Sequence, residues 1–440
     1  SISSIEVNKI KGVSVKSVDQ MLQGRSAGLY MVQSSGMPGS GSSVRIRGGN
    51  SISGGNEPLY IIDGVPVYPS TDNNQTALNP LNSIPTSDIA SIEVLKDASA
   101  TAIYGSRGAN GVIIITTKSG KSGKTTVSFE SYLNIQNTAK EYKLLDAPTF
   151  ERLSNEALVN AGGQPLYDES VTPATTDWQK LTANENALVQ NYQLSLSGGN
   201  ENTTFLTSFN YFDQEGIIKS TDMKKYSFRT NLNHKVSSSI NLGLNLTMTK
   251  VDNNRSGLAT LGNRLGVPPN VPVIDSDGEY TYQYGADAVF DNPVAIIKDR
   301  VDRRSQFRTL NNVFAEWALL KNLKLRSSFG IDIIYTTSDI YNPNTVQSGR
   351  VQGGTATKNS NNSLMWINEN ILTYTNTWGK HNLTGLIGFT QQSSNDNALS
   401  AGSYGYLNDI LEMNNLASGT TYSAPSSSVI KWALNSYLGR

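Results

Sequence analysis

Residues 226–236, YSFRTNLNHKV, alternate between apolar and polar side chains along most of their length. The apolar set consists of Tyr226, Phe228, Leu232 and Val236, and the positions between them carry mainly Ser, Arg and Asn. A period of two is the pattern of a β-strand whose two faces meet different surroundings. The same alternation recurs in residues 240–249 and 323–333.

About ten such stretches follow the first quarter of the chain, and most are near or above the ~10 residues that a tilted strand needs to cross a bilayer. They begin near Thr125, Asn191, Thr203, Lys224, Ser239, Phe307, Asn322, Ser363, Lys380 and Val429. This length and number predict a large antiparallel sheet.

The segments between these stretches alternate in length. Short ones are GNEN (199–202), VSSS (236–239), LKN (320–322) and TWGK (377–380), whereas the others are medium or long and rich in Asn, Ser, Thr and Gly. Tight turns on one side and long loops on the other are typical of an outer-membrane β-barrel. A soluble sandwich also has alternating strands, but it has no reason for this asymmetry.

The composition excludes several classes of protein. Lys+Arg and Asp+Glu number 36 each, so no basic footprint for nucleic acid exists, and the absence of Cys excludes thiolate chemistry. Mean hydropathy is −0.34 and no run approaches the ~18 apolar residues of a membrane helix, but barrel strands keep hydropathy low. The start, SISSIEVNKI, lacks the features of a signal peptide, so we expect a mature or truncated N-terminus.

The character of the chain changes at SGKSGK, residues 119–124. Before it, apolar runs such as PLYIIDGVPV (58–67) and GVIIITTK (111–118) alternate with brief helical signals. We therefore predict a small α+β domain in 1–120, a connector in 121–124 and barrel strands in 125–440.

Two helices are expected in the first domain. One covers Ser17 to Gly24, because Ser17 and Gln20 have the spacing of a capping box. The other begins at Asp97, whose side chain can accept from the first helical amides, and Gly105 is placed to end it with a positive φ.

Residues 91–121, SIEVLKDASATAIYGSRGANGVIIITTKSGK, closely resemble the C-terminal signature of the plug in SusC/RagA-type TonB-dependent receptors. Residues 44–67 look like the central motif of that plug, and residues 28–48 agree in order and spacing. The resemblance is strong over 1–124 and weaker beyond, where PVIDSDGEY (272–280) is similar to an external-loop segment of the family.

The resemblance implies a membrane β fold, in which a plug closes a 22-stranded barrel. Ten strands make an incomplete barrel, and SVIKWALNSYLGR (428–440) stops within a strand-like run without a terminal aromatic residue. Because open sheet edges are costly in lipid, we expect a longer chain, or a partner such as the barrel-assembly machinery that covers the edge.

The plug motifs supply the candidate site residues, which are Arg45, Arg47, Asp63, Glu93, Lys96, Asp97, Tyr104, Arg107 and Asn110. Arg45 and Arg47 alternate with apolar neighbours, so they are expected to point to one face. The resemblance implies that this face, and Arg107, meet acidic residues of the barrel wall. The candidates there are Glu130, Glu316 and Glu369, and a solvated plug surface is the alternative.

Catalysis is not expected. The carboxylates, lysine and tyrosine of the segment 93–110 could serve acid–base chemistry, but capping by Asp97 and glycine turns account for them. The glycines of 36–49 lack the order of a dinucleotide fingerprint, and no Walker lysine follows. We predict no enzyme activity and no cofactor.

Metal binding is not expected either. His234 and His381 are far apart and lack acidic neighbours at ligand spacing. The segment Asp275, Asp277, Gly278 and Glu279 offers oxygen ligands without the rest of an EF-hand loop, so we predict a tight turn.

Aromatic residues stand near the ends of several predicted strands. Trp317, Tyr335, Trp366, Trp378 and Trp432 suit the aromatic girdles at the two membrane interfaces. Contact with a sugar or with the plug is the alternative for some of them.

The resemblance implies TonB-dependent import of an oligosaccharide or a peptide across the Gram-negative outer membrane. The plug would face the periplasm and the long loops the exterior. The implied partners are a SusD-like surface lipoprotein as a lid, the TonB complex and outer-membrane lipid. The alternatives are a signalling receptor with little transport and a soluble glycan-binding β-protein, and no substrate-contacting residue can be named.

Overall fold

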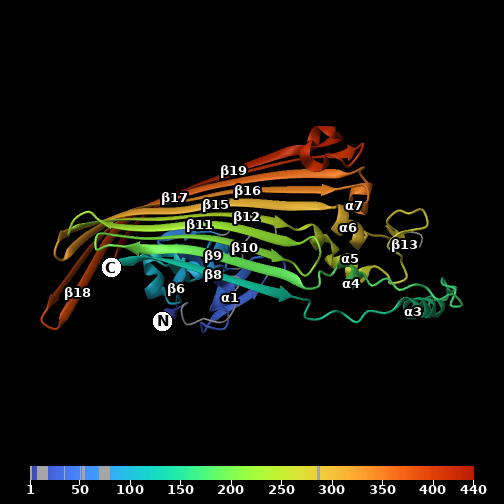
Figure 1. Cartoon of the computed structure of the whole chain (residues 1–440), viewed down its shortest axis with the longest axis horizontal. Coiled ribbons are helices and arrows are strands. Elements are labelled where there is room, and N and C mark those ends of the chain that lie inside the picture. Colours follow the sequence, from blue (N-terminus) through green and yellow to red (C-terminus); the bar gives the residue numbers. More distant parts are fainter. Residues whose placement is uncertain are drawn as a thin grey trace.

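The computed structural model describes residues 2–6, 18–33, 35–49, 51, 55–68, 80–284 and 288–440. A small mixed domain lies beside a long sheet of ten strands (Figure 1). Helices and loops gather at one end of that sheet.

The small domain is built on a five-stranded sheet in the order β1-β6-β7-β4-β5. Its strands are β1 (Ile2–Glu6), β4 (Leu59–Ile62), β5 (Val65–Val67), β6 (Ile89–Leu95) and β7 (Val112–Thr117). A hairpin of β2 (Leu29–Gln33) and β3 (Ser42–Ile46) packs with α1 (Val18–Leu22). The remaining elements are α2 (Ala98–Thr101) and the 3-10 helices η2 (Pro80–Ser83), η3 (Thr86–Asp88) and η4 (Ala102–Gly108).

The helices of this domain differ from the sequence predictions in detail. α1 lies inside the expected range, but Ser17 falls outside the described residues, so the capping box is not tested. α2 begins directly after Asp97 as predicted, yet the Asp97 side chain makes no cap hydrogen bond because Arg47 binds its carboxylate. Gly105 has a φ of 59°, but it interrupts η4 and does not end α2, which stops at Thr101.

The ten long strands form one antiparallel sheet in which chain neighbours are sheet neighbours. They are β8 (Gly123–Gln136), β9 (Ala187–Gly199), β10 (Thr203–Glu215), β11 (Asp222–Lys235), β12 (Ile240–Asn254), β15 (Val301–Leu320), β16 (Leu323–Asn342), β17 (Thr355–Trp378), β18 (His381–Tyr406) and β19 (Gly419–Gly439). The expected membrane β architecture is confirmed, as a partial barrel whose edges β8 and β19 do not meet.

The ten predicted stretches correspond to these ten strands, although some begin earlier than predicted. β19 begins at Gly419, ten residues before Val429. Its first half, GTTYSAPSSS, is rich in Ser and Thr, so no alternation marks it, but its backbone still pairs with β18.

Connectors differ at the two ends of the sheet. Residues 200–202, 236–239, 321–322 and 379–380 make short turns at one end, and the long segments lie at the other (Figure 1). The long segments carry α3 (Ala147–Asn160), α4 (Trp178–Thr182), α5 (Thr260–Gly266), α6 (Pro293–Asp299), α7 (Gln347–Arg350), β13 (Gln283–Tyr284), β14 (Ala288–Val289), η5 (Ser256–Ala259), η6 (Glu412–Asn414) and η7 (Leu416–Ser418). In the described part of the chain, no helix is long and apolar enough to cross a membrane.

The long loops contain an apolar cluster of their own. Trp178, Val267 and Phe290 are buried together with neighbouring valines, and the Trp178 indole donates to the Pro268 carbonyl at 3.2 Å. α4, α5 and α6 are therefore packed against one another beyond the strands.

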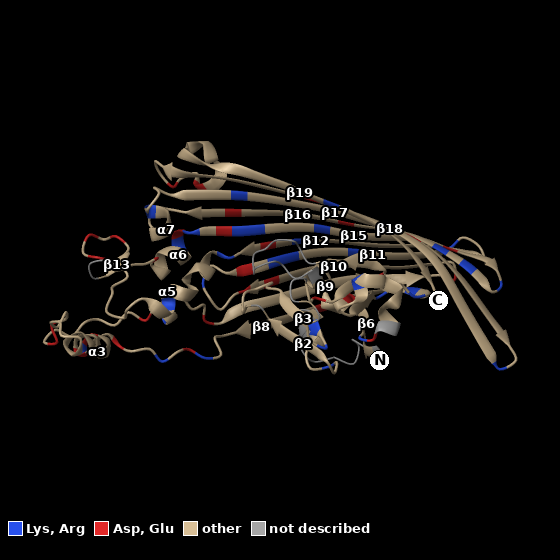
Figure 2. Ribbon diagram, turned by 180° about the vertical axis from the view of Figure 1, so that it is seen from behind, with Lys and Arg blue, Asp and Glu red and all other residues tan. Residues whose placement is uncertain are grey.

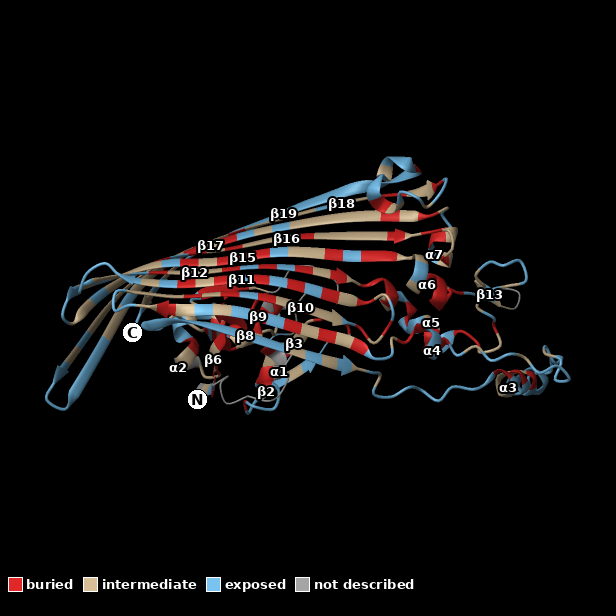
Figure 3. Cartoon of the chain, viewed as in Figure 1, coloured by how far each residue is buried: buried red, intermediate tan, exposed pale blue. Residues whose placement is uncertain are grey.

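The polar face of the sheet is buried and its apolar face is exposed, which is the reverse of the burial in a water-soluble protein. On β11, Arg229 and Ser227 are 1% and 2% exposed, whereas Tyr226 and Phe228 are 39% and 40% exposed. Buried and exposed bands alternate along the strands (Figure 3), and most of their length carries neither acidic nor basic residues (Figure 2). An exposed apolar face opposite a buried polar face is what a lipid-facing barrel wall requires.

A cross-strand aromatic row marks one border of the apolar face. The register places Tyr192, Tyr211, Tyr226, Phe307 and Tyr335 in this row, with Lys250 between the third and fourth. On β15, Trp317 lies ten residues beyond the row, toward the short turns. Ten residues at ~3.3 Å span about 33 Å, or about 25 Å along the normal at a strand tilt of ~40°, the height of a barrel's apolar band.

The aromatics predicted for the girdles therefore separate into groups. Trp317 and Tyr335 lie at opposite borders of the band, and Trp378 is exposed beside the short β17–β18 turn. Trp366 stacks on Phe329 inside the band, with 6.2 Å between ring centroids. Trp432 contacts the small domain, as described below.

Candidate functional site at the contact between the two domains

Asp63 joins the strand ends of the small domain and faces the long sheet. It follows β4 with a φ of 47°, a conformation that Asp tolerates better than most residues, and Gly64 at φ 90° completes the turn. Its carboxylate accepts from the Thr117 amide at 2.9 Å and the Thr117 hydroxyl at 2.5 Å. Its carbonyl accepts from the Asn312 amide of β15 at 2.8 Å.

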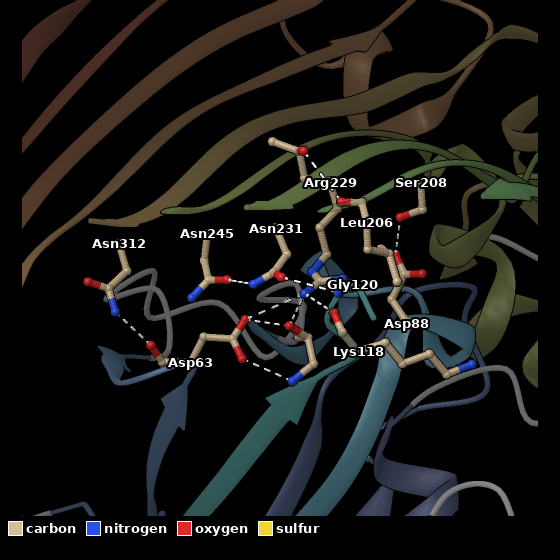
Figure 4. Close-up of polar contacts among 12 residues, drawn as sticks. Asp63, Asp88, Lys118, Gly120, Leu206, Ser208, Arg229, Asn231, Asn245 and Asn312 are labelled. Atoms are coloured by element: carbon tan, nitrogen blue, oxygen red, sulfur yellow. Dashed lines mark hydrogen bonds and ion pairs between the residues drawn. The ribbon is translucent and has the colours of Figure 1, made fainter. Parts of the chain in front are cut away.

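Arg229 of β11 supplies the matching cation (Figure 4). Its Nη2 donates to the Lys118 carbonyl at 2.7 Å and to the Thr117 hydroxyl, and it lies 4.0 Å from Asp63 Oδ2. The side chain is 1% exposed, so it approaches Asp63 in a region shielded from water. A barrel cation thus holds the end of β7.

Asp88 is the second carboxylate of this contact. It directly precedes β6, is 2% exposed, and accepts from the Ser208 hydroxyl and the Gln193 amide, each at 2.6 Å. Burial raises the pKa of Asp88, although the Ser208 hydrogen bond and the charge of Arg229 act in the opposite direction. Lys225 of β11, also buried, places another cation near Asp88.

The long sheet also binds the backbone of the small domain. Asn231 accepts from the Gly120 amide at 3.4 Å, and Asn253 and Thr249 donate to backbone carbonyls of Pro38 and Ser83. At Gly120 a Cβ would lie 2.3 Å from a backbone oxygen of β10, so only glycine permits this approach. The polar face of the sheet is therefore matched to backbone groups as well as to carboxylates.

Of the nine predicted site residues, Arg107 and Asp63 contact the long sheet directly. Arg107 Nη1 donates to Gln392 Oε1 of β18, and its charge faces Glu369 of β17. Tyr104 lies near Glu369 and Glu93, and burial raises its pKa to about 12.

The other predicted residues contact the small domain itself. Lys96 donates to the Ser3 hydroxyl and the Ala27 carbonyl, both at 2.7 Å, and Asn110 donates to the Gly55 carbonyl at 2.8 Å. Arg47 pairs with Asp97 at 2.6 Å.

The expected pairing of Arg45 and Arg47 with barrel carboxylates is not found among the described contacts. The backbone turns at Arg47 (φ 58°), directly after β3, so the strand alternation that predicted one shared face ends there. Arg45 lies near Glu57 of the small domain. Of the barrel candidates, Glu316 binds Arg326 at 3.3 Å, Glu130 is exposed, and Glu369 faces Arg107.

Sequence reasoning missed Asp88, Arg229, Lys225 and Gln392. The available signal was a charged residue on the polar side of an alternating strand, as at Arg229. In a barrel filled by a plug, that side is buried, so a charge there needs a partner on the plug.

A cavity of about 830 Å³ lies between the small domain and β16–β19. Glu57 and Tyr68 line it from the small domain, and Asp332, Asp396 and Trp432 from the strands, with Asn and Ser residues between them. Trp432 meets Tyr68 edge-on at 5.9 Å, and Arg308 binds Asp332 at 2.9 and 2.5 Å. Burial raises the pKa of Glu57. Such a mixture of aromatic rings, amides, hydroxyls and carboxylates suits a polar ligand with many hydrogen-bonding groups.

The segment predicted to be a tight turn forms one. The Asp275 carboxylate accepts from the amides of Asp277 and Glu279, both at 3.0 Å, and Gly278 has a φ of 84°. Across the described ranges, no three His, Asp or Glu side chains come together as a metal site.

This arrangement defines a class, a plugged β-barrel in which a small domain is held against the polar inner wall. Residues 1–112 match the TonB-dependent Receptor Plug Domain family. A TonB-dependent receptor of Formosa agariphila is 34% identical over all of this chain and 44% of its own length.

Two further comparisons agree. The TonB-dependent receptor SusC of Bacteroides thetaiotaomicron is 32% identical over 65% of this chain and 28% of its own length. The structure of the RagAB peptide importer in its closed-closed state matches all of this chain and 52% of its own, with a TM-score of 0.81 and 26% identity. The chain belongs to the SusC/RagA-type TonB-dependent receptors, and it spans less than half the length of these curated relatives.

Proposed function

We propose that the whole protein imports a nutrient across the outer membrane of a Gram-negative bacterium, with the plug gating the barrel lumen. The observation that carries this proposal is the hydrogen-bonded contact made by Asp63, Asp88 and Arg229. Each net hydrogen bond contributes only ~1 kcal/mol because water can replace either partner. A plug held in this way can be released into water at moderate cost.

The cargo we propose is an oligosaccharide or a peptide held in the cavity between Tyr68 and Trp432. RagAB, a similar structure described as a peptide importer, supports the peptide class, and the oligosaccharide class rests on the family resemblance of the plug motifs. A SusD-like surface lipoprotein would close the external side, and the TonB complex would supply the energy. The long loops would face the exterior and the plug the periplasm.

We assign residues 1–120 to the plug, 121–124 to a connector and 125–440 to the first part of the barrel. The end of β7 at Thr117 and the start of β8 at Gly123 support this division. The cluster of helices α4, α5 and α6 would then lie outside the cell.

The two other functions have less support. A soluble glycan-binding protein would expose the apolar row of Tyr226, Phe307 and Tyr335 to water at considerable cost. A signalling receptor with little transport would use the same plug and barrel, so uptake itself must be measured. The relatives are described as receptors and as an importer.

A cysteine pair tests the gating step, because the chain has no native cysteine. Ser87 and Gln193 lie across the contact, 2.7 Å apart at their polar atoms. In the full-length protein, Ser87→Cys with Gln193→Cys joined by a short reducible cross-linker should abolish uptake, and reduction should restore it. Each single cysteine variant is the control. Undiminished uptake through the cross-linked protein would contradict plug gating.

A further inference from the structure

Gln392 of β18 connects two separate parts of the plug through one side-chain amide. Its Oε1 accepts from Arg107 Nη1, and its Nε2 donates to the Tyr68 hydroxyl at 3.3 Å and to Met365 Sδ at 2.9 Å. The residue is 3% exposed, so no bulk water can substitute for a lost partner.

The Tyr68 end of this connection opens into the cavity. Tyr68 and Trp432 both line it, and their rings meet edge-on with an interplanar angle of 82°. Trp432 is 36% exposed, which leaves part of the indole available to a ligand. A sugar ring or another flat group that stacks on Trp432 would compete with the edge of Tyr68 for the same surface.

The Arg107 end leads to the side of the plug that carries the first strand. Arg107 belongs to η4, which follows α2 directly. The residues before α2 contact two other parts of the small domain, because Lys96 donates to Ser3 of β1 and Asp97 binds Arg47, which follows β3. Loss of the hydrogen bond between Arg107 and Gln392 therefore acts on the segment next to these contacts.

We propose that Tyr68, Gln392 and Arg107 form a relay through which an occupant of the cavity loosens η4. The oxygen and nitrogen of an amide are fixed in one plane, so a rotation that follows Tyr68 also turns the acceptor away from Arg107. If the Gln392 amide stayed in place while Tyr68 moved, the Nε2 of Gln392 would be a buried donor that had lost its Tyr68 partner. The relay rests on the proposed function only in that the occupant is the imported nutrient.

The relay can be tested without any cargo. Thr101 of α2 is 6% exposed and packs against Gly108 of η4, so Thr101→Cys reports the opening of this region to a maleimide. In the full-length protein, Tyr68→Phe removes only the acceptor hydroxyl. It should raise the labelling rate about fivefold, the factor expected from the loss of one hydrogen bond.

Matched controls separate a relay from general loosening. Ser83→Cys, on the part of the plug bound by β12, should keep its labelling rate in the Tyr68→Phe protein. Tyr335→Phe, on the outer face of the sheet, should change neither site. In a Gln392→Met background, Tyr68→Phe should add nothing further, because the amide that joins the two ends is gone.

An unchanged rate at Thr101→Cys, or an equal rise at Ser83→Cys, would overturn the relay. A rise confined to Thr101→Cys, absent in the Gln392→Met background, would support it. Import is measured separately, so a failed relay leaves the import proposal standing, and a failure of import leaves the labelling result intact.

Discussion

Replacing Arg229 by methionine removes a buried cation and keeps most of the side-chain volume. Two hydrogen bonds are lost, to Thr117 and Lys118, at ~2 kcal/mol each because the donor is charged. Part of this loss is offset, because Nε and Nη1 of Arg229 are buried without a hydrogen-bond partner among the described residues, and the removal of each relieves ~1 kcal/mol. The net weakening of plug attachment is about 2 kcal/mol, or roughly 30-fold in the released population.

Maleimide labelling of Ser83→Cys in the full-length protein measures that population. Ser83 is 7% exposed and its carbonyl is bound by Thr249 of β12, so the thiol reacts when the plug moves away. Arg229→Met should speed labelling roughly 30-fold. Arg303→Met, at an exposed position of β15, is the matched control and should leave the rate unchanged. A rate within about twofold of the parent would refute the reasoning.

Three more predictions concern single positions. Since burial raises the pKa of Asp88 above 3.8, its protonated form favours the attached plug, and this contribution is lost as pH rises through the raised value. Relative to an exposed cysteine labelled at the same pH, which corrects for the thiolate fraction, the Ser83→Cys rate should therefore fall in acid, and Asp88→Asn should remove this part of the pH dependence. Gly120→Ala forces a Cβ to 2.3 Å from a backbone oxygen, so thermal unfolding should show a loss of ~2 kcal/mol or more, whereas Gly262→Ala, with open space, should not. Val313→Arg, 53% exposed inside the apolar band, should cost ~2–4 kcal/mol and lower the fraction of protein recovered in the outer membrane. Ser305→Arg, beyond the aromatic row, should leave recovery unchanged, and equal recovery of both variants would contradict the placement of the band.

The strands could be predicted because a barrel wall gives each position one of two fixed environments. In 226–236 the apolar and polar side chains alternate along most of the stretch for this reason, and β11 covers nearly all of the predicted strand. Where both environments accept Ser and Thr, as in the first half of β19, the alternation disappears and the predicted start is wrong by ten residues.

The site was harder to predict, because its partners are brought together only when the plug is placed in the barrel. Asp88 and Ser208 are 120 positions apart, and neither belongs to a motif that a local pattern identifies. Asp97 shows the converse problem. The predicted position of Asp97 directly before α2 is correct. Whether its carboxylate binds a helix amide or Arg47, however, depends on how β3 folds back.

The burial of the polar side of the strands, with the apolar side exposed, links the fold to the proposed transport. Because lipid accepts the apolar side of each strand, the polar side is left to face the plug, and the plug supplies carboxylates and backbone groups in addition to its apolar contacts with Leu310, Met365 and Ile367. Asp63, Asp88 and Gly120 do so against β9, β10, β11 and β15. Every one of these contacts involves groups that water can solvate, so the feature that suits the wall to a membrane also makes the plug separable from it.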